Sequence, residues 1–276
     1  MITLIVNADD LGLHPEIDRG IFEAHQDGIV TSSTLLVTGP SAESAVKSAL
    51  KQHLPLGVHL CLASRLPPAA PSDQVRSLLD EQGRFLPSWR ELVVRAARGA
   101  LNLSEVEIEF RAQIGRIQEL GVKPDHLDSH QHLHLLPGIR GVVCRLAIEF
   151  NLPLRWPHFE PRLGWLSQPS TAAKTVLILG LAKLSSDPGV EKVRSVGIFE
   201  AGNLTEARLL TLIGELQNGL YEIGCHPGRT PREVPEEPGW KYGWEDEFRA
   251  LISPKVQALL KARGIELQSF QSAFRV

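Results

Sequence analysis

Short apolar segments of strand length alternate along the chain with longer segments of helical periodicity. Side chains of a strand alternate with period two, whereas the apolar side of a helix returns about every 3.6 residues. The strand-length segments are ITLIVN at 2–7, TSSTLLVT at 31–38, LGVHLCL at 56–62, the DHLDS region, LPLRW at 152–156, VGIF at 196–199 and LYEIGC at 220–225. The segments of helical spacing lie between them, at 17–28, 42–52, 104–120, 138–150, 171–184 and 205–217.

The order of strand and then helix occurs about seven times. Repeated βα units predict a parallel sheet covered by helices, either an open doubly wound sheet or a closed barrel. A repeat number near seven or eight favours the second: an α/β fold, an irregular (β/α) barrel of seven or eight mostly parallel strands. Because the chain shows no repeat of fixed length and no low-complexity stretch, we expect a single domain over residues 1–276.

Composition and charge narrow the class of partner. The formal net charge of -3 gives no basic surface, so we expect neither nucleic acid nor an anionic membrane as partner. No apolar run is long enough to cross a membrane, and ITLIV leads directly into Asn7 without a secretory leader. The three cysteines lie far apart and form no CxxC pair, which is typical of a reducing compartment. We therefore expect a cytoplasmic protein with a small ligand.

Unusual polar residues fall where the predicted strands end. In parallel α/β folds the ligand lies at the carboxyl ends of the strands, among the loops that follow. The polar residues at these ends are Asp9, Asp10, His59, the histidines of 126–134, Arg155 and His226. Carboxylates and imidazoles gathered on one rim are suited to a divalent metal ion or to acid and base catalysis. Three Pro-rich connections, 66–72, 157–169 and 227–239, are candidate walls or lids.

The stretch PDHLDSHQHLH at 124–134 contains four of the ten histidines. If it is extended, His126, Asp128, His130, His132 and His134 share one side. Positions 126 and 134 would then be about 26 Å apart, so only neighbours two residues apart could bind one ion. Spacing therefore nominates Asp128 with His130, or His130 with His132. The other histidines could donate hydrogen bonds to ligands, lie in a loop or contact a substrate, and for the last role His132 is our candidate.

Two local alternatives apply to single motifs. Asp9 and Asp10 could cap a helix or a turn, but adjacent carboxylates repel each other, and a cation beside histidines explains the pair better. Cys225 and His226 could form a nucleophilic dyad. Adjacent strand residues point to opposite sides, however, so we expect Cys225 to pack in the core.

Six motifs in order carry a family resemblance. They are VNADDLG at 6–12, GIVTSSTLLVTG at 28–39, GVHLCL at 57–62, HLDSHQHLH at 126–134, CHPG at 225–228 and the tail FRALISPKVQALLKARGIELQSF at 248–270. Together they resemble the YdjC-like carbohydrate deacetylases, the group that includes chitooligosaccharide deacetylase. The resemblance spans nearly the whole chain, and it implies an irregular α/β barrel that removes an acetyl group from an N-acetylated sugar with a metal ion.

The resemblance also implies roles for single residues. The metal ligands of the family fall on Asp10, His59 and His130, its general base on Asp9 and its acid on His226. A weaker resemblance to the NodB-type polysaccharide deacetylases places Arg155 of Arg155-Trp156-Pro157 beside the base. Two imidazoles and a carboxylate favour Zn²⁺ on ligand softness, whereas the resemblance implies Mg²⁺. A homodimer is also an expectation of the resemblance.

Other functions share parts of this pattern. Two histidines and a carboxylate also bind iron in oxygenases, but those are usually all-β barrels, which the βα alternation disfavours. A metal-dependent phosphoesterase would be expected to have a phosphate-binding glycine loop, and none is visible in the sequence. A non-catalytic sugar-binding barrel would be expected to lack the acid or the base, whereas Asp9 and His226 are both present.

Overall fold

The computed structural model describes residues 1–158, 169–183, 189–230, 234 and 242–274. The strands are β1 (Ile2–Leu11), β2 (Ser32–Leu35), β3 (Leu56–Leu60), β4 (Leu127–Ser129), β5 (Leu154–Pro157), β6 (Lys192–Val196), β7 (Gly219–Cys225) and β8 (Ile265–Leu267). The helices are α1 (Pro15–Gln26), α2 (Ala42–Gln52), α3 (Trp89–Ala97), α4 (Leu103–Glu119), α5 (Ile139–Glu149), α6 (Pro169–Lys183), α7 (Glu206–Glu215), α8 (Trp244–Leu251), α9 (Pro254–Ala262) and α10 (Phe270–Phe274).

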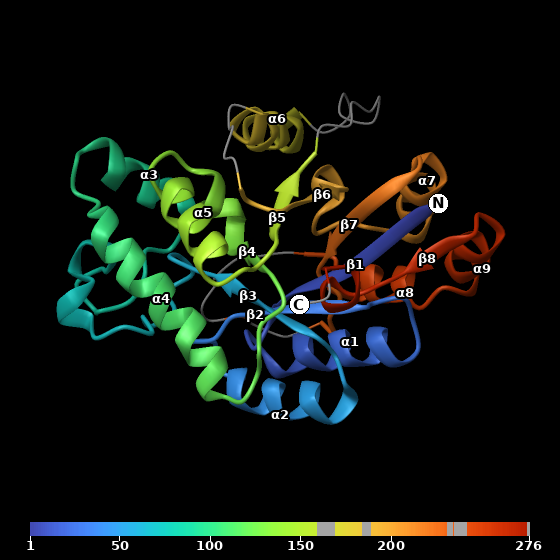
Figure 1. The fold of residues 1–276 in the computed structure, drawn as a ribbon, viewed down its shortest axis with the longest axis horizontal. Coiled ribbons are helices and arrows are strands. Elements are labelled where there is room, and N and C mark those ends of the chain that lie inside the picture. The colour runs from blue at the N-terminus through green and yellow to red at the C-terminus, as the bar shows by residue number, and fades with distance from the viewer. Residues whose placement is uncertain (159–168, 184–188, 231–233, 235–241, 275–276) are drawn as a thin grey trace.

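Seven parallel strands close into a barrel. Neighbouring strands pair in the order β2-β3-β4-β5-β6-β7-β1, and β1 also pairs with β2, which completes the ring. The eighth strand, β8, lies outside the ring and pairs with the first residues of β1, Ile2 to Leu4. Helices surround the strands on the outside (Figure 1). The predicted irregular (β/α) barrel is thereby confirmed.

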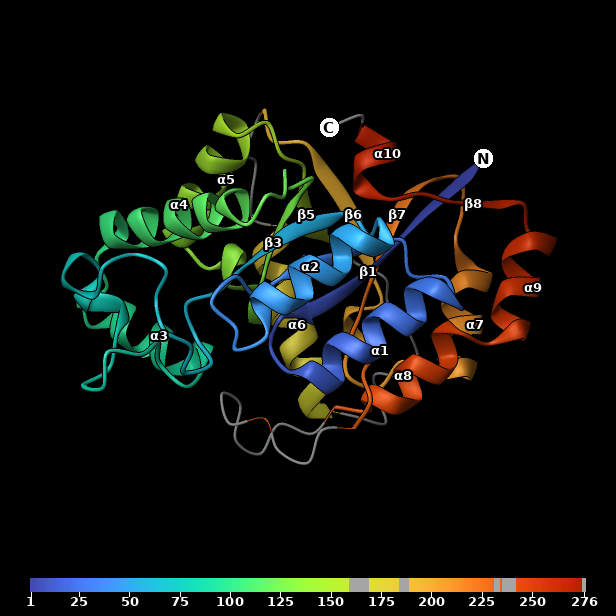
Figure 2. The ribbon, with the colours of Figure 1, turned by 90° about the horizontal axis from the view of Figure 1, so that it is seen from below.

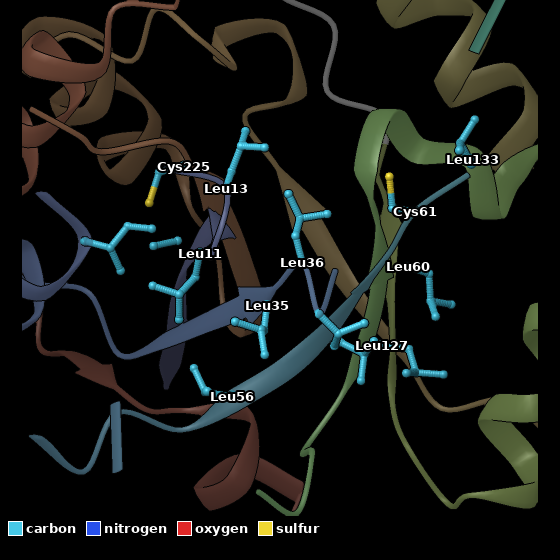
Figure 3. Packing of buried hydrophobic residues seen from close by; sticks show 14 of the residues in the cluster. Leu11, Leu13, Leu35, Leu36, Leu56, Leu60, Cys61, Leu127, Leu133 and Cys225 are labelled. Carbon is cyan, nitrogen blue, oxygen red and sulfur yellow. The ribbon is translucent and has the colours of Figure 1, made fainter. Parts of the chain in front are cut away.

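Apolar side chains on the outer side of the strands form the main core. Leu35, Leu60 and Leu127 come from three neighbouring strands and are fully buried in one hydrophobic cluster (Figure 3). Burying a leucine side chain stabilises the fold by about 1.5–3 kcal/mol. Because the strand period is two, the alternate residues point into the barrel, and near the carboxyl ends those inner residues are polar, as Asn7 and Asp9 of β1 illustrate.

The opposite end of the barrel is closed by an aromatic side chain. Phe270 of α10 is fully buried with Ile5 of β1 and Val193 of β6. Its ring stacks on the imidazole of His126, with ring centroids 3.6 Å apart. Figure 2 shows α10 at the end of the molecule where β1 begins. We call this end of the barrel, filled by Phe270, its floor. The carboxyl ends of the strands, where the unusual polar residues lie, are at the other end.

Several strand predictions were wrong in their limits, among them those at 126–134 and 196–199. The stretch at 126–134 is not extended throughout, because β4 ends at Ser129 and His130–Leu135 form a 3₁₀ turn. Gln131 and His132 there adopt positive φ angles of 55° and 56°, which rotate the following histidines away from the strand direction. The strand predicted at 196–199 lies earlier, at Lys192–Val196, because Gly197 with φ of 82° ends it.

The connection after β3 contacts α4 and the 3₁₀ turn that follows β4. Its Pro-rich part at 66–72 is held by Glu109 of α4, which accepts hydrogen bonds from the amides of Ala69 and Ala70 at 2.9 and 3.0 Å. Further along, the amide of Trp89 donates to Oε1 of Gln131 at 2.9 Å, next to His130. The other predicted lids, 157–169 and 227–239, lie mostly outside the described residues. Among the described helices, none is both long and apolar enough to cross a bilayer.

Candidate active site

The barrel brings the sequence-predicted polar residues together at the carboxyl ends of its strands. Asp9 and Asp10 belong to β1 and Arg155 to β5. His59 comes from β3, while His130 and His226 directly follow β4 and β7. More than a hundred positions separate several of these residues in the chain, yet their side chains lie within direct contact of one another.

Asp10, His59 and His130 form a compact cluster. Nδ1 of His130 is 2.8 Å from Oδ1 of Asp10, and Nε2 of His59 is 3.3 Å from the same oxygen. One potential ligand atom from each residue lies within 4.8 Å of the others, and all three residues are buried. Asp10 reaches this place because its backbone adopts a positive φ of 66°.

The cluster has the properties of a divalent cation site. Oδ2 of Asp10 is buried and has no hydrogen-bond partner among the described residues. A carboxylate with two imidazoles is a common donor set for Zn²⁺ and related ions. Burial by itself would lower the pKa of His59, but Asp128 and Asp10 raise it to about 10, so the surroundings favour positive charge at this point. A cation would provide that charge in place of the proton.

Asp128 holds His59 from the other side. Its Oδ1 lies 2.7 Å from Nδ1 of His59, which leaves Nε2 of the ring directed at Asp10. A carboxylate at the far nitrogen fixes the tautomer and orientation of a metal-binding histidine. Spacing predicts Asp128 with His130, or His130 with His132, as neighbouring ligands. In the structure Asp128 contacts His59 instead, and because the strand ends before His130, the His130 ring contacts Asp10.

Arg155 is fully buried among three carboxylates. It binds Asp9 through two hydrogen bonds of 2.5 and 2.6 Å, Asp128 at 2.9 Å and Glu222 at 2.6 Å. Burial alone would raise the pKa of Asp9, but the charge and hydrogen bonds of Arg155 hold it well below its ordinary value. Asp9 is therefore an ionised carboxylate in a fixed orientation.

His226 is the most open of these groups, with 12% of its side chain exposed. Its Nε2 lies 3.9 Å from Oδ2 of Asp9 and 4.0 Å from Oδ2 of Asp10. Glu247 of α8 accepts the backbone N–H of His226 at 2.6 Å and lies 3.8 Å from its Nδ1. Burial would lower the pKa of His226, but Glu247 raises it, which favours the protonated ring.

Sequence reasoning missed Glu222 and Glu247. Glu222 had a signal: it is the charged residue within the apolar run LYEIGC, and a charge inside a buried strand requires a partner. Glu247 had none that could be read locally, because it lies on a helix whose packing against the rim depends on the whole fold.

Three other residues considered in the sequence are not among the clustered ligand residues. His132 is half-buried in the 3₁₀ turn, and its ring centroid is 6.1 Å from that of His134. His134 is buried, which lowers its pKa to about 3 and keeps it neutral. Cys225 packs in the core, as expected. Burial raises the pKa of its thiol, which donates to the carbonyl of Asn7 at 3.3 Å.

Fold and site together define an α/β barrel with a buried carboxylate and imidazole cluster at the carboxyl ends of its strands. The chain belongs to the family of YdjC-like proteins, whose model matches residues 3–262. It is 42% identical to a carbohydrate deacetylase of Brevibacillus brevis, over 97% of this chain and 98% of that protein. It is 33% identical to a chitooligosaccharide deacetylase of Yersinia enterocolitica, over 97% of each.

A solved structure has the same fold. The crystal structure of an Enterococcus faecalis protein, proposed to cleave cellobiose phosphate, superposes with a TM-score of 0.79 at 30% identity. The match covers 99% of this chain and 98% of that one. The predicted family is therefore confirmed.

Proposed function

We propose that this chain is a carbohydrate deacetylase that hydrolyses the acetamide of an N-acetylated sugar or chitooligosaccharide to a free amine and acetate. The observation that carries the proposal is the cluster of Asp10, His59 and His130, in contact with the Arg155-bound carboxylate of Asp9. Relatives that cover nearly the whole chain are named as carbohydrate deacetylases.

Asp10, His59 and His130 would hold a divalent cation, Mg²⁺ or Zn²⁺. When bound, such an ion polarises an acetyl carbonyl and lowers the pKa of a bound water. Asp128 keeps His59 in the tautomer that presents Nε2 to the ion. Ligand softness supports Zn²⁺ and the family resemblance supports Mg²⁺, so both belong in the assay.

Asp9 is the proposed base. Arg155 fixes both oxygens of this carboxylate and keeps it ionised at neutral pH, ready to take a proton from a water molecule beside it.

His226 is the proposed acid. Glu247 favours its protonated form, and its Nε2 lies on the same side of the cluster as Asp9. The sugar nitrogen is a poor leaving group as an anion, because that anion is too strong a base. It must therefore receive this proton as the C–N bond breaks, so that it leaves as an amine. His132 stays a proposed substrate contact.

Acetate release measures the reaction directly. The panel is N-acetylglucosamine, chitobiose and longer chitooligosaccharides, each with Zn²⁺ and with Mg²⁺. Asp10→Ala and His59→Ala should abolish metal uptake and acetate release together, because each removes one of the few ligands. His53→Ala is the matched control, since His53 is exposed at the end of α2. A cluster variant that releases acetate at the rate of the unaltered protein would contradict the proposal.

A phosphorylated disaccharide belongs in the same panel, because the Enterococcus faecalis relative is proposed to cleave cellobiose phosphate. The surroundings of Arg155 favour deacetylation over phosphate recognition. Its guanidinium is already bound by Asp9, Asp128 and Glu222, and would have to release one of them to bind a phosphate. Phosphate release without acetate release would reverse this conclusion.

We also propose that the protein acts in the cytoplasm as a homodimer and without nucleic acid or membrane partners. The net charge of -3 and the family resemblance support this. Light scattering behind a sizing column would measure the mass of the assembly, for which a 30.4 kDa species would exclude the dimer.

A further inference from the structure

Asp18 is a buried carboxylate that the proposed reaction does not use. It lies in the first turn of α1 and is only 6% exposed. Its Oδ1 accepts the backbone N–H of Gly12 at 2.7 Å. Burying a carboxylate is unfavourable without a compensating interaction, and burial raises the pKa of Asp18 to about 6. The groups that stabilise the ionised carboxylate, the Ser41 side chain and the Gly12 amide, therefore identify what the side chain does.

The turn that Asp18 holds is the one that presents Asp10. Asp10 and Gly12 both adopt positive φ angles, 66° and 91°. For a residue with a side chain, such as Asp10, this conformation costs about 1–2 kcal/mol and persists only where the surroundings enforce it.

Backbone hydrogen bonds fix the other groups of this turn. The amide of Leu13 donates to the carbonyl of Asp10 at 3.1 Å, and the amide of Leu36 donates to that of Leu11 at 2.9 Å. The amide of Ser41 donates to the carbonyl of Gly12 at 3.0 Å. The amide of Gly12 is directed instead at a side chain, and that side chain is Asp18.

We propose that Asp18 is a positioning residue: it holds the left-handed turn at Asp10–Gly12 so that the Asp10 carboxylate faces His59 and His130. The inference rests on the proposed function in so far as Asp10 is a metal ligand. Gly39 supports the turn from the other side, since a Cβ there would lie 2.2 Å from the carbonyl oxygen of Gly12. Asp10 is thus placed by contacts from α1 and from the segment that leads into α2.

Three variants test the acceptor that Asp18 provides. Asp18→Asn keeps an oxygen for the Gly12 amide and loses the charge, whereas Asp18→Ala removes the acceptor. Asp18→Glu keeps the charge but moves the carboxylate by one methylene. We expect Asp18→Ala and Asp18→Glu to weaken Zn²⁺ affinity about tenfold or more, and Asp18→Asn to stay within about threefold of the unaltered protein.

The measurements are Zn²⁺ competition against a coloured chelator and the visible spectrum of the Co²⁺-loaded protein, which reports the coordination geometry. Far-ultraviolet circular dichroism confirms that each variant is folded, and Asp18→Glu replaces Asp18→Ala if the latter does not fold. Glu16→Ala is the control, because Glu16 lies in the same helical turn with its side chain 45% exposed. Equal affinity for all variants, or equal loss for Asp18→Asn and Asp18→Ala, would overturn the inference.

Acetate release is measured in parallel and separates the two proposals. Metal binding without acetate release from any sugar would refute the proposed function, while the affinities of the variants would still decide the role of Asp18. Acetate release by an Asp18→Ala variant with unchanged Zn²⁺ affinity and unchanged Co²⁺ spectrum would refute the role of Asp18 alone. Absence of metal binding by the unaltered protein would refute both.

Discussion

At the scale of single residues, the protonation states of the site depend on one buried arginine. Arg155 forms ion pairs with carboxylates on three different strands, and the interaction with Asp9 is bidentate. Burial raises the pKa of Glu222, and Arg155 opposes that shift, whereas Asp9 is held ionised. The pKa of Asp9 is therefore lowered and that of Glu222 raised, although both carboxylates contact the same guanidinium.

Asp9→Asn separates the base from the metal site. The variant keeps the size of the side chain. Asp9 is not one of the three proposed ligands, and it lies close to His59 in a group with Asp128, whose carboxylate, like that of Asp9, is bound by Arg155. We expect metal uptake to remain and turnover to fall about 100-fold or more, the usual contribution of general-base assistance. Metal content and acetate release are measured on the same preparation. Undiminished turnover would rule out Asp9 as the base.

His226→Ala should have an effect that depends on the leaving group. Acetate release from an acetamide should fall about 100-fold or more, because the amine needs a proton. Hydrolysis of p-nitrophenyl acetate, whose leaving group departs as an anion, should fall far less. His53→Ala again provides the control. Equal losses on both substrates would show that His226 does not act as an acid.

Much of the site could be inferred from residues and motifs alone. The predicted ligands and the predicted base come together because each ends a strand of one parallel sheet, which places them on a common rim. Glu247 could not be foreseen, because it reaches His226 from helix α8 and does not lie at the end of a strand. The direction of His132 could not be foreseen either, because a positive φ for a non-glycine residue has no reliable sequence signal.

At the scale of elements, helix α1 carries the buried acid that supports the turn at Asp10. Burial raises the pKa of Asp18 in the folded protein from its ordinary value of 3.8 to about 6, so the folded protein binds this proton more tightly than the unfolded chain. The stabilisation that comes from this tighter proton binding is fully present below about pH 4 and is lost as the pH rises to about 6. A shift of this size corresponds to about 3 kcal/mol.

Asp18→Asn should remove this decline. The free energy of unfolding of the variant minus that of the unaltered protein should increase between pH 4 and pH 7 by up to about 3 kcal/mol. Urea titrations at the two pH values measure it. A difference that does not change with pH would show that Asp18 titrates normally in the folded protein.

The limits of the predicted helices match the structure more closely than those of the predicted strands, although α3, α8, α9 and α10 were not predicted. The helical segments at 42–52 and 138–150 match α2 and α5 within a residue, because their apolar spacing extends over several turns. β4 has only three residues, too few for a period of two to define an end. In α3 only Leu92 is buried, so the helix has only a short apolar pattern.

At the scale of the whole molecule, the barrel has two different ends. The carboxyl end holds the charged cluster, whereas the other end is filled by Phe270 stacked on His126. Repeated βα units were enough to predict a barrel. They could not show that β8 lies outside the ring or that α10 fills its floor, because both depend on contacts of the last part of the chain with residues far from it in sequence, such as Ile2, His126 and Val193.

Phe270→Ala should destabilise the barrel strongly. The side chain is fully buried, and truncating a buried phenylalanine leaves a cavity that typically costs about 3–5 kcal/mol. Phe274→Ala is the matched control from the same helix, since Phe274 is only half-buried. Urea unfolding measures both. Similar losses for the two variants would show that the floor does not depend on Phe270.

The pairing of β1 with β7 has a consequence for how activity is lost. Seven residue pairs join these strands, from Ile2 with Gly219 to Ala8 with Cys225, and β1 is also paired with β2 and β8. Asp9, Asp10 and His226 are attached to this central pair, whose amide hydrogens should exchange with deuterium only on global unfolding. Heat inactivation should accordingly follow the melting of the entire barrel, with no earlier step in which the active site fails while the rest stays folded.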